Sequence, residues 1–344
     1  MKKTRRTMGR LLSGITVAVA AGVCMTGAAF AEEQTSLKIA YLVDTLDESQ
    51  HFLSDNMEKY CGYLEETKGY DIEYNVFDAK MSLTEQMAQI ENCVAMGYDG
   101  VVINPVDTEG ILPTIETAQD AGLVVLDLRS SNDIYDLQMD YANEYQRGEK
   151  MKEWFLNYMD ENPDKVFYVG LLQGDAKTPQ TMPRCDVIAT IAEERPDNFI
   201  VLDEQYCTDW TTDSAMKIVE DWLQVYPEMN FICSAAEQLA YGAAQVLQQA
   251  GVQDDFVQIT VNGEAMGIEM IRKGQVIMDS GNFTPATAAG AIGLLVDGIT
   301  EGTRGHYDYS DYTMFFMTKD NVDEVEERYA TFDWAEMGEP KKID

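Results

Sequence analysis

The chain has 344 residues, of which 45% are hydrophobic, so it is long enough to bury two ordinary domain cores. Its 60 acidic and 25 basic side chains give a formal charge of −35 at pH 7. An exterior this acidic repels polyphosphates and anionic lipids, and we therefore expect neither nucleic acid nor an anionic membrane surface as a partner.

The first 31 residues predict an export signal. Five cationic side chains precede the apolar run LLSGITVAVAAGVC, and Ala29-Phe30-Ala31 has the small-x-small cleavage pattern, so we place the cut after Ala31. The alternatives are a membrane anchor, for which the run is short, and lipidation of Cys24, for which Val23 stands where a small residue is wanted. Removing the signal takes the charge from −35 to −40. The mature chain is expected in the periplasm, the cell envelope or the extracellular space, without direct membrane insertion.

Residues 37 to 128 alternate short apolar runs with stretches of helical periodicity. Helices between short β-rich runs predict βαβ units and a parallel sheet. Gly69, Gly97 and Gly122 each follow a helical stretch, where a left-handed cap is wanted. The strands are expected at 37–43, 71–77, 100–104 and 124–128, and the helices around 52–64, 83–96 and 111–121.

The same alternation begins again at residue 165. Two successive α/β units predict two doubly wound parallel-sheet lobes of similar build rather than one barrel. The strand-like segment 136–143 between them predicts a hinge of extended chain. The strands of the second unit are expected at 165–172, 199–205, 230–235, 257–263 and 275–281.

The mature chain keeps five cysteines, an odd number with no C-x-x-C pair and no metal spacing. We expect them to be small buried side chains rather than disulfides or metal ligands. They are Cys61, Cys93, Cys185, Cys207 and Cys233.

Polar side chains follow the predicted strands at their carboxyl ends. In an open parallel sheet, ligands bind beyond those ends, where the loops to the next helices converge. Helix capping explains some of these residues equally well, because caps favour Asp, Asn and Ser. The residues are Asp44, Asn104, Asp127, Arg129, Asp203, Glu237, Asn262 and Asn282.

The common catalytic motifs are absent from the sequence. It holds no G-x-G-x-x-G after a strand, no phosphate-binding P-loop and no G-x-S-x-G, and it has only two histidines. Asp160, Asn162 and Asp164 resemble the start of a calcium loop, but Lys165 stands where that loop needs glycine, so we interpret the stretch as a helix end. We therefore expect no cofactor, no metal and no enzymatic activity.

Four segments together resemble the periplasmic sugar-binding proteins of the ribose/galactose type: LKIAYLVDTL, YDGVVINPVDTEGILPTIETAQDAGLVVLDLRSS, FICSAAEQLAYGAAQVLQQAG and ITVNGEAMGIEMIRKGQV. The resemblance implies the type I periplasmic-binding-protein fold, with two lobes that are joined by a three-strand hinge and close on one sugar. It also implies that the ligand is handed to an ABC permease, or alternatively presented by an adaptor to a membrane sensor kinase or chemoreceptor. We expect a monomer.

The resemblance carries three binding residues onto this chain: Arg129, Arg184 in TMPRCD and Trp210 in CTDWTTDSA. An arginine fork can bind two neighbouring hydroxyls, and a flat ring suits the C–H face of a pyranose. The alternatives are surface salt bridges for the arginines and a core position for the tryptophan.

Other positions depart from the family pattern. Asn262 replaces an aspartate, and His51 and Phe52 are the only ring candidates after the first strand. Because an amide both donates and accepts, and because two arginines are expected nearby, a sugar acid is at least as plausible a ligand as a plain aldose. The predicted ligand-binding set is Asp44, His51, Phe52, Asp127, Arg129, Arg184, Trp210, Glu237, Asn262 and Asn282.

With crossings expected near Tyr141, Thr284 and Met314, the resemblance divides the chain into four parts. Residues 331–344 are expected to be an acidic tail whose aromatic side chains pack on a lobe. The other parts are a signal at 1–31, an N-terminal lobe of 37–140 plus 285–310, and a C-terminal lobe of 142–283 plus 314–330.

Overall fold

The computed structural model describes residues 35–128, 134–176, 181–337 and 341–343. The predicted signal segment, Cys24 and the predicted binding residue Arg129 lie outside these ranges. Within them, the helices are too short or too polar to cross a membrane.

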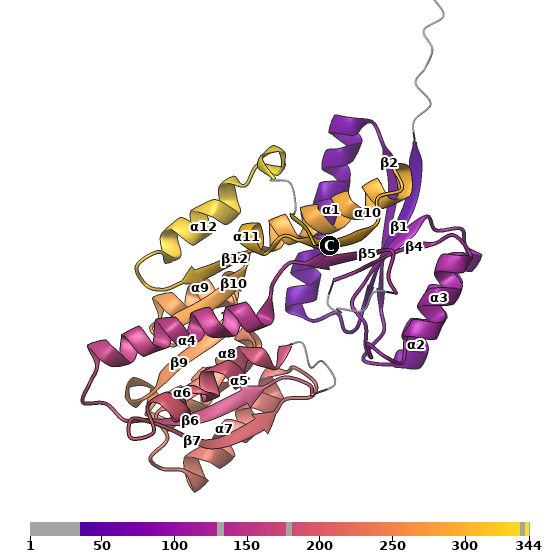
Figure 1. The fold of residues 1–344 in the computed structure, drawn as a ribbon. Helices are drawn as coiled ribbons and strands as arrows, with labels where there is room; N and C mark the ends of the chain where they lie inside the picture. The colour runs from indigo at the N-terminus through magenta and orange to yellow at the C-terminus, as the bar shows by residue number, and fades with distance from the viewer. Residues whose placement is uncertain (1–34, 129–133, 177–180, 338–340, 344) are drawn as a thin grey trace, which may run out of the picture. The chain divides into compact units, whose positions relative to one another are not determined.

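The first sheet is parallel apart from one edge strand, and its strand order is β13-β11-β5-β4-β3-β1-β2. Figure 1 labels β1, β2, β4 and β5 of this sheet. Only β13 runs antiparallel to its neighbour, β11. The strands are β1 (Ser36–Val43), β2 (Asp71–Asp78), β3 (Gly100–Ile103), β4 (Val124–Asp127), β5 (Leu137–Asp140), β11 (Gly305–Asp308) and β13 (Lys341–Ile343).

Helices cover both faces of this sheet, which is why its strands are apolar on both sides. Met57 and Leu295 belong to the core under one pair of helices, and Ile90 and Ile115 to the core under the other pair. The first pair is α1 (Glu48–Lys68) and α10 (Thr284–Thr300), and the second is α2 (Leu83–Ala95) and α3 (Leu112–Asp120).

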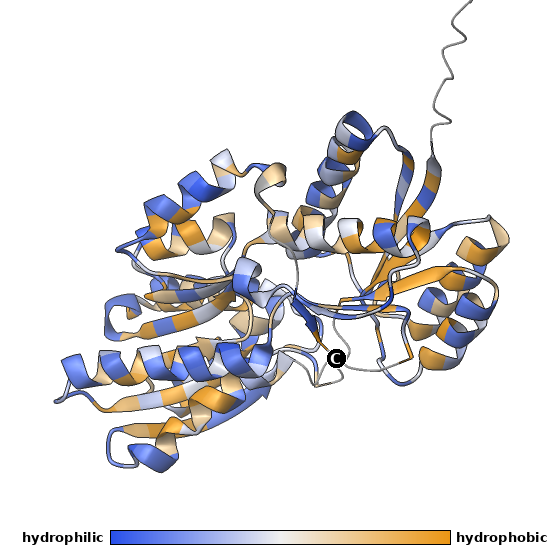
Figure 2. Cartoon of the chain, turned by 45° about the horizontal axis from the view of Figure 1, so that its top comes forward, coloured by the Kyte–Doolittle hydropathy of each residue, from blue (hydrophilic) through white to orange (hydrophobic). Residues whose placement is uncertain are grey.

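The second sheet has the order β12-β10-β9-β8-β6-β7, again with one antiparallel edge strand, β12. Figure 2 shows hydrophobic stretches in the strands of this sheet and hydrophilic residues alternating with hydrophobic ones along its helices. The strands are β6 (Phe167–Gln173), β7 (Phe199–Tyr206), β8 (Phe231–Ser234), β9 (Val257–Asn262), β10 (Met278–Asn282) and β12 (Met314–Met317).

One face of the second sheet carries α4 (Glu144–Glu161), α5 (Pro183–Ala189) and α6 (Ile191–Glu194), and the other carries α7 (Thr212–Val225) and α8 (Glu237–Ala250). A smaller core unites α9 (Ala265–Arg272) with α12 (Val322–Thr331). A short helix, α11 (Ser310–Thr313), leads into β12.

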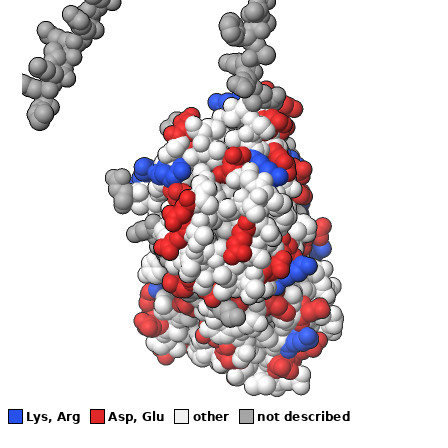
Figure 3. Space-filling model, turned by 90° about the vertical axis from the view of Figure 1, so that its right-hand side faces the viewer, with Lys and Arg blue, Asp and Glu red and all other residues white. Residues whose placement is uncertain are grey.

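The predicted fold class is confirmed: two doubly wound α/β sheets form in the predicted order, and every predicted strand is present. The five cysteines are buried, as predicted, and the structure shows them as free thiols. Helix α4 ends at Glu161, so the calcium-loop resemblance is a helix end. On the face drawn in Figure 3, acidic side chains are spread among fewer basic ones.

The lobe boundaries remain a proposal, for which the sheets supply the following support. The chain leaves the first sheet after β5, returns to it after β10 through α10, and enters the second again at β12. In the predicted tail, Trp334 contacts the ring of Tyr60, and Phe332 contacts the ring of Phe283. Because β13 pairs with β11, we assign the end of the tail to the first lobe.

Gly69 ends α1 in the left-handed region, with φ of 73°, and its N–H donates to the carbonyl oxygen of Glu65 at 3.2 Å. A methyl group there meets no atom within 4 Å, so Gly69→Ala carries backbone strain alone. We expect the free energy of unfolding in urea to fall by about 1 kcal/mol. Gly62→Ala, inside the same helix and equally unobstructed, is the control and should raise it by roughly 0.5–1 kcal/mol. Equal effects of the two variants would contradict this account.

Candidate functional site

A pocket of about 60 Å³ lies at the carboxyl ends of strands from both sheets. Asn262 and Asn282 come directly from the ends of β9 and β10, whereas Asp44 follows β1. This is where ligands bind to open parallel sheets. The lining residues are Asp44, Thr45, Asp47, Ser49, Gln50, Tyr141, Thr181, Arg184, Trp210, Ala236, Gln238, Asn262 and Asn282.

The structure brings half of the predicted binding set to this pocket: Asp44, Arg184, Trp210, Asn262 and Asn282. The remaining predicted residues are placed elsewhere. Three line an adjacent cavity of about 240 Å³, one is fully buried at the end of β4 and lines neither, and one is outside the described residues. The residues of the adjacent cavity are His51, Phe52 and Glu237. The buried residue at the end of β4 is Asp127, and the residue outside the described ranges is Arg129.

Gln50 is a pocket residue that the sequence analysis missed. Asp47 caps α1 by accepting a hydrogen bond from the Gln50 N–H at 2.8 Å, which sets Gln50 in the first turn of the helix. Its side-chain oxygen accepts hydrogen bonds from Tyr41 and from Asn104. The cap could have been predicted, because aspartate is favoured at that position. The pocket contact could not, because it depends on where the helix lies.

Trp210 is held in a strained backbone conformation, with φ of 55°. Its indole lies against Gly174, just after β6, so closely that a methyl group on Gly174 would fall 1.8 Å from the ring. Asn262 also has a positive φ, of 149°. Bulky residues avoid this region, and such strain concentrates at binding sites where the surrounding structure enforces it.

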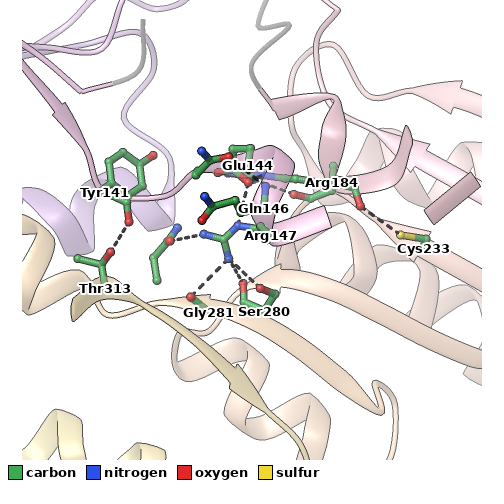
Figure 4. Close-up of polar contacts among 12 residues, drawn as sticks. Tyr141, Glu144, Gln146, Arg147, Arg184, Cys233, Ser280, Gly281 and Thr313 are labelled. Atoms are coloured by element: carbon green, nitrogen blue, oxygen red, sulfur yellow. Dashed lines mark hydrogen bonds and ion pairs between the residues drawn. The ribbon is translucent and has the colours of Figure 1, made fainter. Parts of the chain in front are cut away.

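Arg184 enters the pocket from the first turn of α5, and Glu144, at the start of α4, holds it with two hydrogen bonds (Figure 4). The guanidinium Nε donates to Glu144 at 2.9 Å and Nη2 donates at 2.7 Å, while Nη1 donates to the carbonyl oxygen of Ala235 at 2.9 Å. Burial would raise the pKa of Glu144, but the charges of Arg147 and Arg184 outweigh it and hold this pKa below its usual value.

Arg147 is the second arginine on Glu144 and is fully buried. Its Nε donates to Glu144 at 2.8 Å, and its Nη1 donates to the carbonyl oxygen of Ser280 at 2.6 Å and to the Ser280 hydroxyl at 2.9 Å. Its Nη2 donates to the side-chain oxygen of Asn282. Arg147 therefore joins the start of α4 to Ser280 and Gly281 of β10 (Figure 4). Asn282, the last residue of that strand, lines the pocket.

A cluster of carboxyl groups lies behind the Asn262 turn. Glu237, only 2% exposed, accepts a hydrogen bond from the Glu264 N–H at 2.6 Å, so it supports the backbone instead of lining the main pocket. Burial raises the pKa of Asp279 to about 6, and burial followed by the charge of Asp279 raises the pKa of Glu237. Burial also raises the pKa of Glu264 to about 7; the Ser49 hydroxyl, which donates to it at 2.9 Å, opposes that rise.

We expect Glu264 to make stability fall as pH rises. Its folded pKa lies above the unfolded value, so its contribution is fully present below about pH 4.5 and is lost as pH rises through about 7. The side chain in Glu264→Gln is neutral at every pH. Between pH 5 and pH 8 this variant should therefore lose roughly 2 kcal/mol less unfolding free energy than the native protein loses. Urea unfolding at both values measures this, with Glu228→Gln, an exposed glutamate, as control. An unchanged pH dependence in Glu264→Gln would refute the assignment.

Comparisons with known proteins agree on one family. A family model described as the periplasmic binding protein domain matches residues 39–302. A putative rhizopine-binding protein of Rhizobium meliloti is 26% identical, over 71% of this chain and 76% of that protein. A xylitol-binding protein of Mycolicibacterium smegmatis is 21% identical, over 93% and 89%. An ABC transporter solute binding protein from Bacillus halodurans with bound myo-inositol has the same fold, with a TM-score of 0.73 at 20% identity, covering 87% of this chain and all of that one.

Proposed function

The chain belongs to the periplasmic binding protein family, and from that premise we propose that it is an exported receptor for a monosaccharide, a related polyol or a sugar acid, which it delivers to an ABC permease. Family membership agrees with the resemblance that the sequence shows to the sugar-binding proteins of the ribose/galactose type. The two relatives are named for binding rhizopine and xylitol, and the solved structure contains bound myo-inositol. All of these names point to small polyhydroxylated ligands.

The observation that carries the proposal is the composition of the pocket wall. An indole ring stands beside amide and guanidinium groups, contributed by Trp210, Asn262, Asn282 and Arg184. A sugar or cyclitol presents C–H faces that pack on an aromatic ring, together with hydroxyls that both donate and accept hydrogen bonds. Pockets with a few placed polar groups bind such small ligands with defined orientation.

Binding and release without chemical conversion are all that this function requires. Gln50, Asn262 and Asn282 are neutral amides, which orient hydroxyls and are poor proton carriers at neutral pH. In the described part of the chain, no group of three His, Cys, Asp or Glu side chains is placed to hold a metal ion.

Isothermal titration tests the binding claim directly. The panel contains D-ribose, D-galactose, xylitol, myo-inositol, D-glucuronate and an amino sugar. We expect saturable binding of at least one member with one site per chain, and binding of none would overturn the proposal. Delivery is tested separately: the loaded protein should stimulate ATP hydrolysis by its permease in proteoliposomes, whereas the empty protein should stimulate it less.

A further inference from the structure

We propose that Glu144 determines the charge preference of the pocket: by holding Arg184 and Arg147 in one ion cluster, it makes the site select uncharged polyols over sugar acids. This inference rests on the proposed function, because it concerns the ligand of the same pocket. It departs from the expectation, drawn from the sequence, that two arginines make a sugar acid at least as plausible as an aldose.

Arg184 is the one cation among the lining residues that the structure describes. Its Nε and Nη2 both point to the Glu144 carboxylate, at 2.9 and 2.7 Å, so Glu144 occupies the fork edge of the guanidinium. That edge can bind a carboxylate with two parallel hydrogen bonds. A ligand carboxylate would have to displace Glu144 from it.

Glu144 also lowers the net charge of the cluster. Glu144 neutralises one of its two arginines, so the group carries one net positive charge in place of two. Its carboxylate is only 11% exposed, and the two arginines keep it ionised at neutral pH. The field that a sugar acid would meet at Arg184 is correspondingly weak.

Asn282 is oriented by the same cluster. A guanidinium can only donate hydrogen bonds, so the contact with Arg147 fixes the Asn282 side-chain oxygen toward Arg147. The Asn282 amino group is then the part that remains for the pocket. Glu144 accepts a hydrogen bond from the Arg147 Nε at 2.8 Å, and so it also helps to fix which end of the Asn282 amide faces the pocket.

The decisive experiment compares matched neutral and acidic ligands: D-glucose with D-glucuronate, and D-galactose with D-galacturonate. In titrations at neutral pH and low salt, the native protein should bind the neutral member of a pair more tightly. Glu144→Gln removes the competing carboxylate and leaves a second positive charge, and should shift the ratio of affinities toward the acid by roughly tenfold or more. Glu149→Gln, an exposed glutamate on the same helix, is the control and should leave the ratio unchanged.

A double variant guards against misfolding, because Glu144→Gln leaves two arginines without their shared partner. Glu144→Gln with Arg147→Gln restores one net positive charge but still frees the fork edge of Arg184. It should also shift the ratio toward the acid. Tighter binding of the acid by the native protein would overturn the inference while sustaining the proposed function. An unchanged ratio in both variants would overturn it as well.

A ligand-free measurement separates the two proposals. In the ¹⁵N spectrum of the native protein, the Nε–H groups of Arg147 and Arg184 should be protected from solvent exchange, and Glu144→Gln should remove that protection. Arg147→Lys and Arg184→Lys identify the two signals. If the native protein binds no sugar, the proposed function fails, and this spectrum still tests the cluster. Protection that survives Glu144→Gln would refute the positioning role.

Discussion

Replacing Arg184 with alanine should weaken sugar binding by roughly 2–5 kcal/mol, which is about thirtyfold to several thousandfold in affinity. Arg184 lies in the pocket wall, and its side chain is only 9% exposed. Its removal would leave ligand oxygens buried without the donor that replaces water. Isothermal titration with any sugar that the native protein binds measures the loss.

The matched control is Arg195→Ala. Arg195 belongs to the same half of the chain, but its side chain is 44% exposed and pairs with the exposed Asp160 at 3.1 Å. Exposed ion pairs contribute little to stability, so Arg195→Ala should change the affinity for the sugar by less than about twofold. Glu144 keeps Arg147 as its partner in Arg184→Ala, so the variant should still fold. Affinity within about threefold of the native value would place the binding site elsewhere.

Much of this pocket could be predicted from the sequence because it follows from strand ends. Asp44, Asn262 and Asn282 stand at or just after apolar strands, and the geometry of a parallel sheet brings such positions together. Arg184 and Trp210 lie in loops and helix starts that carry no such pattern, and only the family resemblance singled them out. Asp127 has the same strand-end position as the others, yet it is buried away from the pocket.

The Glu144–Arg147–Arg184 cluster could not be predicted, because its members meet only through tertiary packing. One signal was present: Arg147 is in line with Met151, Phe155 and Met159 at every fourth residue of α4, on the buried face. A charged residue in such a row has two equal explanations: a buried ion pair, or a helix face that is turned toward solvent at that position. Its partner cannot be identified without the path of the chain.

The same limit applies to Glu237. Its place shortly after the β8 strand suggested a ligand contact, but the helix that it begins turns the side chain toward Asp279 and the Glu264 backbone. Position along the strand is therefore predictable from periodicity, whereas the direction of a side chain at a helix start depends on neighbouring elements.

Arg147→Ala should lower the free energy of unfolding by about 3–5 kcal/mol, because it removes one partner from a buried ion cluster. Arg147 is fully buried, and its loss leaves the Ser280 hydroxyl and the Asn282 oxygen without their donor. It also opens a cavity beneath α4. Urea unfolding measures the change, with Lys150→Ala, an exposed position on the same helix, as the control.

Arg147→Met separates the two causes, since methionine refills the space beside Met151 while leaving the polar groups unpaired. If unpaired polar groups dominate, Arg147→Met should remain within about 1 kcal/mol of Arg147→Ala. If lost volume dominates, methionine should recover most of the stability. A loss below about 1 kcal/mol in both variants would mean that water satisfies Ser280 and Asn282, and that Arg147 does not hold the end of β10 in place.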